Sequence, residues 1–171
     1  MTANSPTSLL SAAEVGALLE ALDDEYRAWA TYDQVIADFG PERPFINIRD
    51  AEARHIQALL PLFERYGIPV PNNPWRGKLP HYPDLQSACA AGVTAEIENA
   101  ALYDRLNAAT TRPDILDVFA RLRDASQERH LPAFQRCAER RGGEGAGRGQ
   151  GRRTHGHAER CRAHTSPENN Q

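Results

Sequence analysis

An internal repeat constrains the fold of this chain more than any other feature of its sequence. The segment EYRAWATYD, residues 25–33, recurs 71 positions later as EIENAALYD, residues 96–104. A second pair, EARHIQALL from residue 52 and QERHLPAFQ from residue 127, repeats an Arg-His dipeptide at an offset of 75 positions. Because the two offsets nearly agree, the sequence predicts one helical hairpin that is used twice.

Apolar residues follow the 3.6-residue period of amphipathic helices in four segments. We expect helices over residues 11–39, 44–66, 84–110 and 111–140. Ser11 and Glu14 have the spacing of a capping box, which predicts where the first helix begins. Gly40 and Gly67 are suited to end the first two helices. The chain is therefore predicted to be all-α.

The connections between these helices predict how the hairpins are arranged. Short turns join the first helix to the second and the third to the fourth, so each pair is antiparallel. The hairpins are joined by GIPVPNNPWRGKLPHYP, a proline-rich segment of 17 residues. Fully extended, it spans at most ~56 Å, which is enough to run along a bundle. Two hairpins with one lengthwise crossover are the topology of a ferritin-like four-helix bundle.

The repeated segments carry side chains that suit a metal centre. Glu52 and His55 are one helical turn apart and share a face, as do Gln127 and His130. The other two expected helices each offer a carboxylate at mid-length. One Glu from each of two helices, with Glu-x-x-His from the other two, is the arrangement of di-iron carboxylate proteins. The candidate ligands are Glu25, Glu52, His55, Glu96 and His130, with Gln127 as a candidate sixth.

Two stretches, RPFINIRDAEARHIQALLPLFERYGIPVP and EIENAALYDRL, resemble the ferritin-like family called domain of unknown function 2202. A Glu followed seven positions later by Tyr, as at Glu25 and Tyr32, also resembles rubrerythrin. The resemblance covers about residues 14–140. It implies a ferritin-like fold and a di-metal centre, with two iron ions as the expected cofactors.

The pattern departs from the resemblance at Gln127, where a Glu is expected. With three carboxylates, two Fe(II) ions would leave one positive charge uncompensated in a core of low dielectric constant. Gln127 can still offer a neutral oxygen or support a ligand through a hydrogen bond. Asp124, one turn earlier, is a short substitute. We therefore expect a weaker metal position at His130, with mixed or single-metal occupancy as an alternative.

Three further side chains are candidates for supporting the metal ligands. Tyr32 and Tyr103 lie seven positions after Glu25 and Glu96, almost two helical turns away on the same face. Each tyrosine is interpreted either as a core residue or as a hydrogen-bond donor to a ligating carboxylate. Asp124 is the third candidate.

These features lead to three functional hypotheses. The first is a non-haem di-iron oxidoreductase that acts on O2 or peroxide, by rubrerythrin-like peroxide reduction or ferroxidase activity. Because the chain lacks the Cys pairs of a rubredoxin iron site, its electrons would come from a separate donor. The second is a metal-handling protein without catalysis. The third is a structural helical bundle with a degenerate site.

Composition narrows the partners and the location. A net charge of −3 does not favour nucleic acid as a binding partner. No apolar run approaches the ~20 residues that a membrane span requires. The N-terminal residues lack a signal-peptide pattern, so we expect a cytoplasmic protein. Ferritin-like bundles often pair as dimers, so by analogy a homodimer is one alternative for this chain. Cys89, Cys137 and Cys161 are too scattered for a disulfide framework, and we interpret the first two as packing residues.

Composition changes near residue 140, where large apolar residues almost cease. We expect a bundle over 8–140 and a disordered Gly/Arg/His-rich tail over 141–171. The tail carries His155, His157, Cys161 and His164. These side chains are interpreted either as a loose metal binder or, more simply, as incidental residues.

Overall fold

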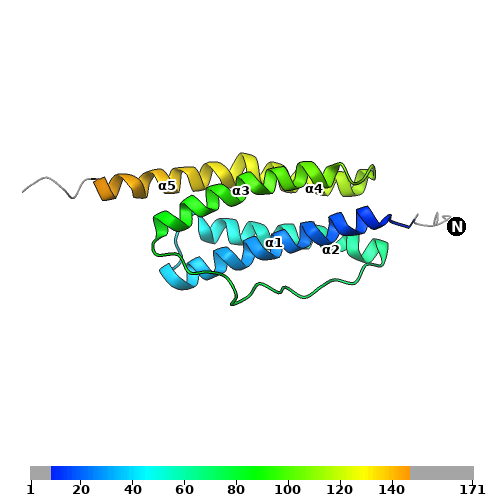
Figure 1. Cartoon of the computed structure of the whole chain (residues 1–171), viewed down its shortest axis with the longest axis horizontal. Coiled ribbons are helices and arrows are strands. Elements are labelled where there is room, and N and C mark those ends of the chain that lie inside the picture. The colour runs from blue at the N-terminus through cyan, green and yellow to red at the C-terminus, as the bar shows by residue number, and fades with distance from the viewer. Residues whose placement is uncertain (1–8, 147–171) are drawn as a thin grey trace, which may run out of the picture.

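The computed structural model describes residues 9–146, with side chains to residue 140, and this part of the chain is helical with no strand. Its elements are α1 (Ala12–Phe39), α2 (Phe45–Tyr66), α3 (Leu85–Asn107), α4 (Pro113–Ala125), η1 (Ser126–His130) and α5 (Leu131–Ala146). Helices α4, η1 and α5 follow one another without interruption, so four helical rods form the molecule (Figure 1). The prediction of an all-α chain is confirmed.

Most of the predicted helix ends agree with the structure to within a residue or two. The capping box is present, since the Ser11 backbone N–H donates to Glu14 Oε2 at 2.8 Å and the Glu14 N–H to Ser11 Oγ at 3.2 Å. Gly67 ends α2 in the left-handed conformation, with φ 67°. The largest difference is at α5, which runs past the break predicted near residue 140. The tail was predicted over residues 141–171, and its part beyond residue 146 lies outside the described residues.

The segment between α2 and α3 runs along the hairpin formed by α1 and α2, from one end of the molecule to the other (Figure 1). Side chains of α1 hold it in place. Trp75 Nε1 donates to Asp23 Oδ1 at 2.9 Å, and the guanidinium of Arg76 lies 4.5 Å from the centre of the Trp29 ring. These contacts order a segment that has no regular secondary structure.

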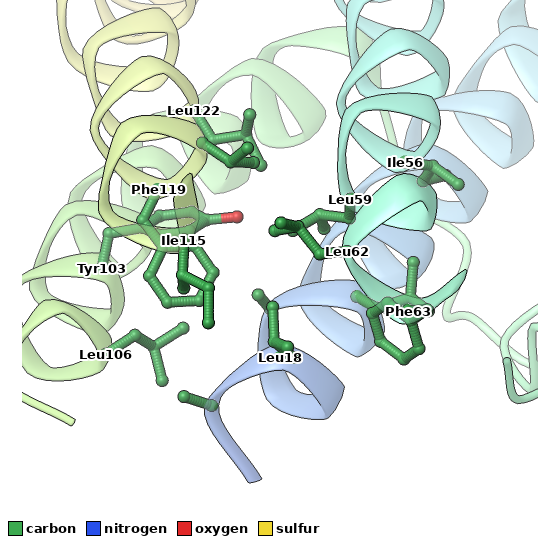
Figure 2. Close-up of a cluster of buried hydrophobic side chains, with 14 residues drawn as sticks. Leu18, Ile56, Leu59, Leu62, Phe63, Tyr103, Leu106, Ile115, Phe119 and Leu122 are labelled. Carbon is green, nitrogen blue, oxygen red and sulfur yellow. The ribbon is translucent and has the colours of Figure 1, made fainter. Parts of the chain in front are cut away.

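The apolar core is divided into two clusters, one on each side of a polar layer. One cluster packs Leu18 and Leu22 against apolar residues of α2, α3 and α4 (Figure 2). The other packs Tyr32, Phe45 and Phe134 with neighbouring residues of α1, α2, α3 and α5. Each rod contributes residues to both clusters, and its buried acidic or imidazole side chain lies between these two groups of residues along the chain. The polar layer is therefore at the middle of the molecule.

Cys89 and Cys137 pack in the apolar core as predicted, but the prediction did not include the bond between them. Their sulfur atoms form a disulfide bond of 2.04 Å that joins α3 to α5. Both residues are buried in the second apolar cluster.

Among the helices of the described residues, none combines the length and the apolar character that a membrane crossing requires.

Candidate metal centre

The four rods bring all five predicted ligands together at the centre of the molecule. Four are almost completely buried, with exposed fractions of 2% for Glu25, 3% for Glu52, 3% for Glu96 and 4% for His130, and His55 is half-buried. They form two clusters, Glu25–Glu52–His55 and Glu52–Glu96–His130. Within each cluster, one ligand atom from every residue lies within 4.8 Å of the others. Glu52 belongs to both clusters, so two ions bound there would share its carboxylate.

The first cluster is connected by close contacts between imidazole and carboxylate. His55 Nδ1 lies 3.1 Å from Glu25 Oε2 and 2.8 Å from Glu52 Oε2. The Tyr103 hydroxyl donates a hydrogen bond to Glu25 Oε1 at 2.6 Å. The imidazole therefore has contacts with two carboxylates in the absence of an ion.

The second cluster contains a buried nitrogen that, among the described residues, makes ion-pair contacts but no hydrogen bond. His130 Nδ1 lies 3.2 Å from Glu52 Oε1 and 3.6 Å from Glu96 Oε2, but it makes no hydrogen bond to any described residue. Buried polar atoms are almost always hydrogen-bonded, so an unpaired one needs an explanation. A cation between these three side chains would provide it.

The two repeated tyrosines support the carboxylates of opposite hairpins. Tyr32 on α1 donates to Glu96 Oε1 of α3 at 2.9 Å, whereas Tyr103 on α3 donates to Glu25 of α1. Burial, followed by the nearby carboxylates, raises the pKa of both tyrosines well above the usual value. Both hydroxyls therefore keep their protons and act as donors, while both rings lie in the apolar clusters, so each tyrosine combines the two interpretations that the sequence left open.

The sixth position differs from the sequence prediction because the fourth rod contains a π-helical turn. In η1, the backbone N–H of Leu131 donates to the carbonyl of Ser126, five residues earlier. The wider turn brings Ser126, rather than Gln127, toward the centre, and its hydroxyl donates to Glu96 Oε2 at 2.5 Å. Gln127 Nε2 instead donates to the backbone carbonyl of Glu96 at 2.9 Å, which ties η1 to α3.

In this region, helical periodicity misplaced Asp124 and gave no indication of Ser126. Asp124 is exposed and belongs to neither cluster, so the prediction that it supports the ligands is wrong. The buried face of α4 passes through Leu122 and Ala125, which leaves Asp124 between them on the solvent side. Ser126 was not predicted, because Ser at an ordinary helical position carries no signal of a metal site.

The electrostatics of the cluster place protons on both imidazoles. Burial lowers the pKa of His55, but hydrogen bonds to Glu25 and Glu52 outweigh this and raise it to about 10. Burial also lowers the pKa of His130, but the carboxylates of Glu52 and Glu96, at 3.2 and 3.6 Å from Nδ1, outweigh this and raise it to about 9. Burial and the charge of Glu52 raise the pKa of Glu25 to about 8. Burial opposes ionisation of Glu52 as well, but the two imidazoles lower its pKa.

The chemistry of these residues fits a pair of divalent cations. Each cluster offers two carboxylates and one imidazole, and both donor types suit first-row transition metals. Three carboxylates in a buried layer are costly without compensating positive charge, which protons supply in the metal-free protein and metal ions would supply in their place. The absence of a hydrogen bond to Nδ1 of His130 from the described residues is a further point in favour of an ion.

Fold and site together define an all-helical bundle with a buried carboxylate–histidine centre. The family model described as "Uncharacterized protein domain (DUF2202)" matches residues 14–149. The chain belongs to this family, which confirms that part of the resemblance drawn from its sequence.

A comparison with solved structures gives the same architecture. The crystal structure of hypothetical protein MJ0754 from Methanococcus jannaschii DSM 2661 superposes with a TM-score of 0.71 at 24% sequence identity. The match covers 81% of this chain and 86% of the archaeal one. At this identity, the likeness shows a shared fold. A comparison with curated proteins gives no match.

Proposed function

We propose that the protein is a ferritin-like di-metal protein, and that it acts as a non-haem di-iron oxidoreductase on O2 or peroxide. The observation that carries this proposal is the position of His130 Nδ1. It is buried, lies within 3.6 Å of two carboxylates and has no hydrogen-bond partner among the described residues. A bound cation would satisfy this nitrogen and both carboxylates at once.

The residues divide naturally between two ions. Glu25 and His55 would hold one, Glu96 and His130 would hold the other, and Glu52 would contact both. Two ferrous ions in this position would supply the two electrons needed to reduce a peroxide bond. A separate protein or small molecule would have to return those electrons.

The surrounding side chains would position the ligands and limit the access of water. The hydroxyls of Tyr32 and Tyr103 fix the orientation of Glu96 and Glu25 through hydrogen bonds. Supporting contacts of this kind keep ligands in place and tune the metal. The apolar clusters on both sides of the layer keep its dielectric constant low, so charged groups interact more strongly there.

One observation favours a structural bundle as a second candidate. His55 Nδ1 contacts the carboxylates of Glu25 and Glu52 at hydrogen-bonding distances, so the first cluster is satisfied without an ion. A polar network of this kind can stabilise one arrangement of a core. In that case chelators would leave the melting temperature unchanged, whereas a protein that binds metal would lose stability on its removal.

Anaerobic loading with Fe(II) tests the proposal. We expect two ions per chain in the wild type, and a ligand-to-metal absorption band when hydrogen peroxide is added. Glu52→Gln should lose both ions, because it removes the shared carboxylate while keeping the shape of the side chain. Glu64→Gln is the matched control, since Glu64 is exposed on the same helix and should bind iron like the wild type. Absence of iron uptake by the wild type, or equal uptake by Glu52→Gln, would refute the proposal.

A further inference from the structure

A pocket of about 420 Å³ lies beside the metal centre and reaches two of its predicted ligands. Its lining includes Glu52 and Glu96, together with Tyr32, whose hydroxyl bonds to Glu96. The walls come mainly from α1 and α3, and the segment between α2 and α3 contributes Leu79, Pro80 and Tyr82 to the lining. The proline-rich crossover therefore helps to shape a space that leads to the centre.

The volume of the pocket exceeds what dioxygen or hydrogen peroxide requires. A water molecule occupies ~30 Å³ in the liquid, and pockets for small organic ligands range over roughly 300–1,000 Å³. At about 420 Å³, this pocket belongs with the organic ligands. A substrate with a carbon skeleton would use the space, whereas hydrogen peroxide would leave most of it to water.

The lining favours a neutral molecule with an apolar body. Val35, Phe45 and Ala91 line the pocket together with other apolar and small side chains. Asp24 on the wall is paired, because it accepts hydrogen bonds from Arg27 at 2.5 Å and from Asn99 at 2.9 Å, whereas Glu98 is an exposed carboxylate among the lining residues. The remaining buried carboxylates are those of the proposed centre, where metal ions would compensate them. Beyond the Asp24–Arg27 pair, the charged lining residues are all acidic, so the pocket does not attract an organic anion.

We propose that the substrate is an organic hydroperoxide, with its apolar body in this pocket and its peroxide group toward Glu52 and Glu96. The inference rests on the proposed function and specifies its substrate class. Two ferrous ions held by the ligand residues would supply the two electrons that cleavage of the O–O bond requires and would become ferric. Two protons are taken up, and the products are the alcohol and water.

Binding of the alcohol product to the metal-free protein tests the pocket without using activity. Cumyl alcohol should bind the wild type and raise its melting temperature. Ala91→Phe places a ring in the pocket and should weaken binding about tenfold through lost apolar contacts. Ala90→Phe is the matched control, because Ala90 is exposed on the same helix and does not line the pocket, so binding should match that of the wild type. Ala95→Phe, at an exposed lining position, repeats the test if Ala91→Phe does not fold.

Kinetics of the iron-loaded protein separate the two proposals. We expect cumene hydroperoxide to be reduced with a higher kcat/KM than hydrogen peroxide, and Ala91→Phe to lower the ratio of the two constants about tenfold. Reduction of hydrogen peroxide alone would overturn the substrate assignment and leave the proposed function intact. Failure with both peroxides would overturn the substrate assignment, and failure of the iron-loaded protein to react with O2 as well would refute the proposed function. Absence of cumyl alcohol binding, or an equal loss in Ala90→Phe, would overturn the pocket assignment.

Discussion

At the scale of single residues, the proposed metal centre carries protons that metal ions would replace. The imidazoles of His55 and His130 lie against carboxylates that raise their pKa values to about 10 and about 9. Burial and Glu52 raise the pKa of Glu25 to about 8. Because pH 7 is below all three pKa values, each of these groups carries a proton in the metal-free protein at that pH.

Metal binding should therefore release protons, because imidazole and carboxylate bind metal only after they lose theirs. We expect up to three protons per chain at pH 7, from His55, His130 and Glu25, and a metal affinity that rises between about pH 6 and about pH 8. A titration with Co(II) in weak buffer containing a pH indicator measures the release. Glu64→Gln should release as many protons as the wild type. Binding without proton release, or an affinity that falls as pH rises, would contradict this protonation scheme.

At the scale of secondary-structure elements, the contact between α3 and α5 depends on the absence of a side chain. A Cβ atom at Gly92 would lie 2.6 Å from Cδ1 of Phe134, whose ring fills the space above the glycine. Phe134 is completely buried and also packs on Tyr32, with ring centres 5.1 Å apart. Gly92 thus allows two helices of the polar layer to approach each other.

Gly92→Ala should destabilise the protein, because the new methyl group forces Phe134 out of its position. Overpacking of this kind costs about 1–3 kcal/mol, and the higher helix propensity of alanine returns about 1 kcal/mol. Gly16→Ala in α1 is the control, since a Cβ there meets no atom within 4 Å and the propensity gain should appear alone. Urea denaturation measures both changes. A stabilised Gly92→Ala protein would show that the α3–α5 contact is looser than described.

Helix ends and the five candidate ligands could be predicted from the sequence, because both depend on local spacing. Glu52 and His55 are three residues apart in a regular helix, and a 3.6-residue period puts them on one face. The same reasoning failed at Gln127 and Asp124, because a π-helical turn changes the register and has no signature in apolar periodicity. The disulfide was missed for a different reason: Cys89 and Cys137 are 48 residues apart, and only tertiary packing brings them together.

At the scale of the whole molecule, the duplicated hairpin explains why the centre lies where it does. Each half supplies one helix with a buried Glu, at Glu25 or Glu96, and a second helix with a His, at His55 or His130. The polar layer forms where the two halves meet. Tyr32 and Tyr103 cross between α1 and α3, so each half supports a carboxylate of the other. The apolar clusters on either side hold this layer together.

Anomalous diffraction from crystals loaded anaerobically with Fe(II) is the most direct test of the central claim. The account predicts two peaks per chain at the iron edge, one on each side of the Glu52 carboxylate. One peak should contact Glu25 and His55, and the other Glu96 and His130. Crystals that bind iron only at surface residues, or that show no peak in the polar layer, would contradict it.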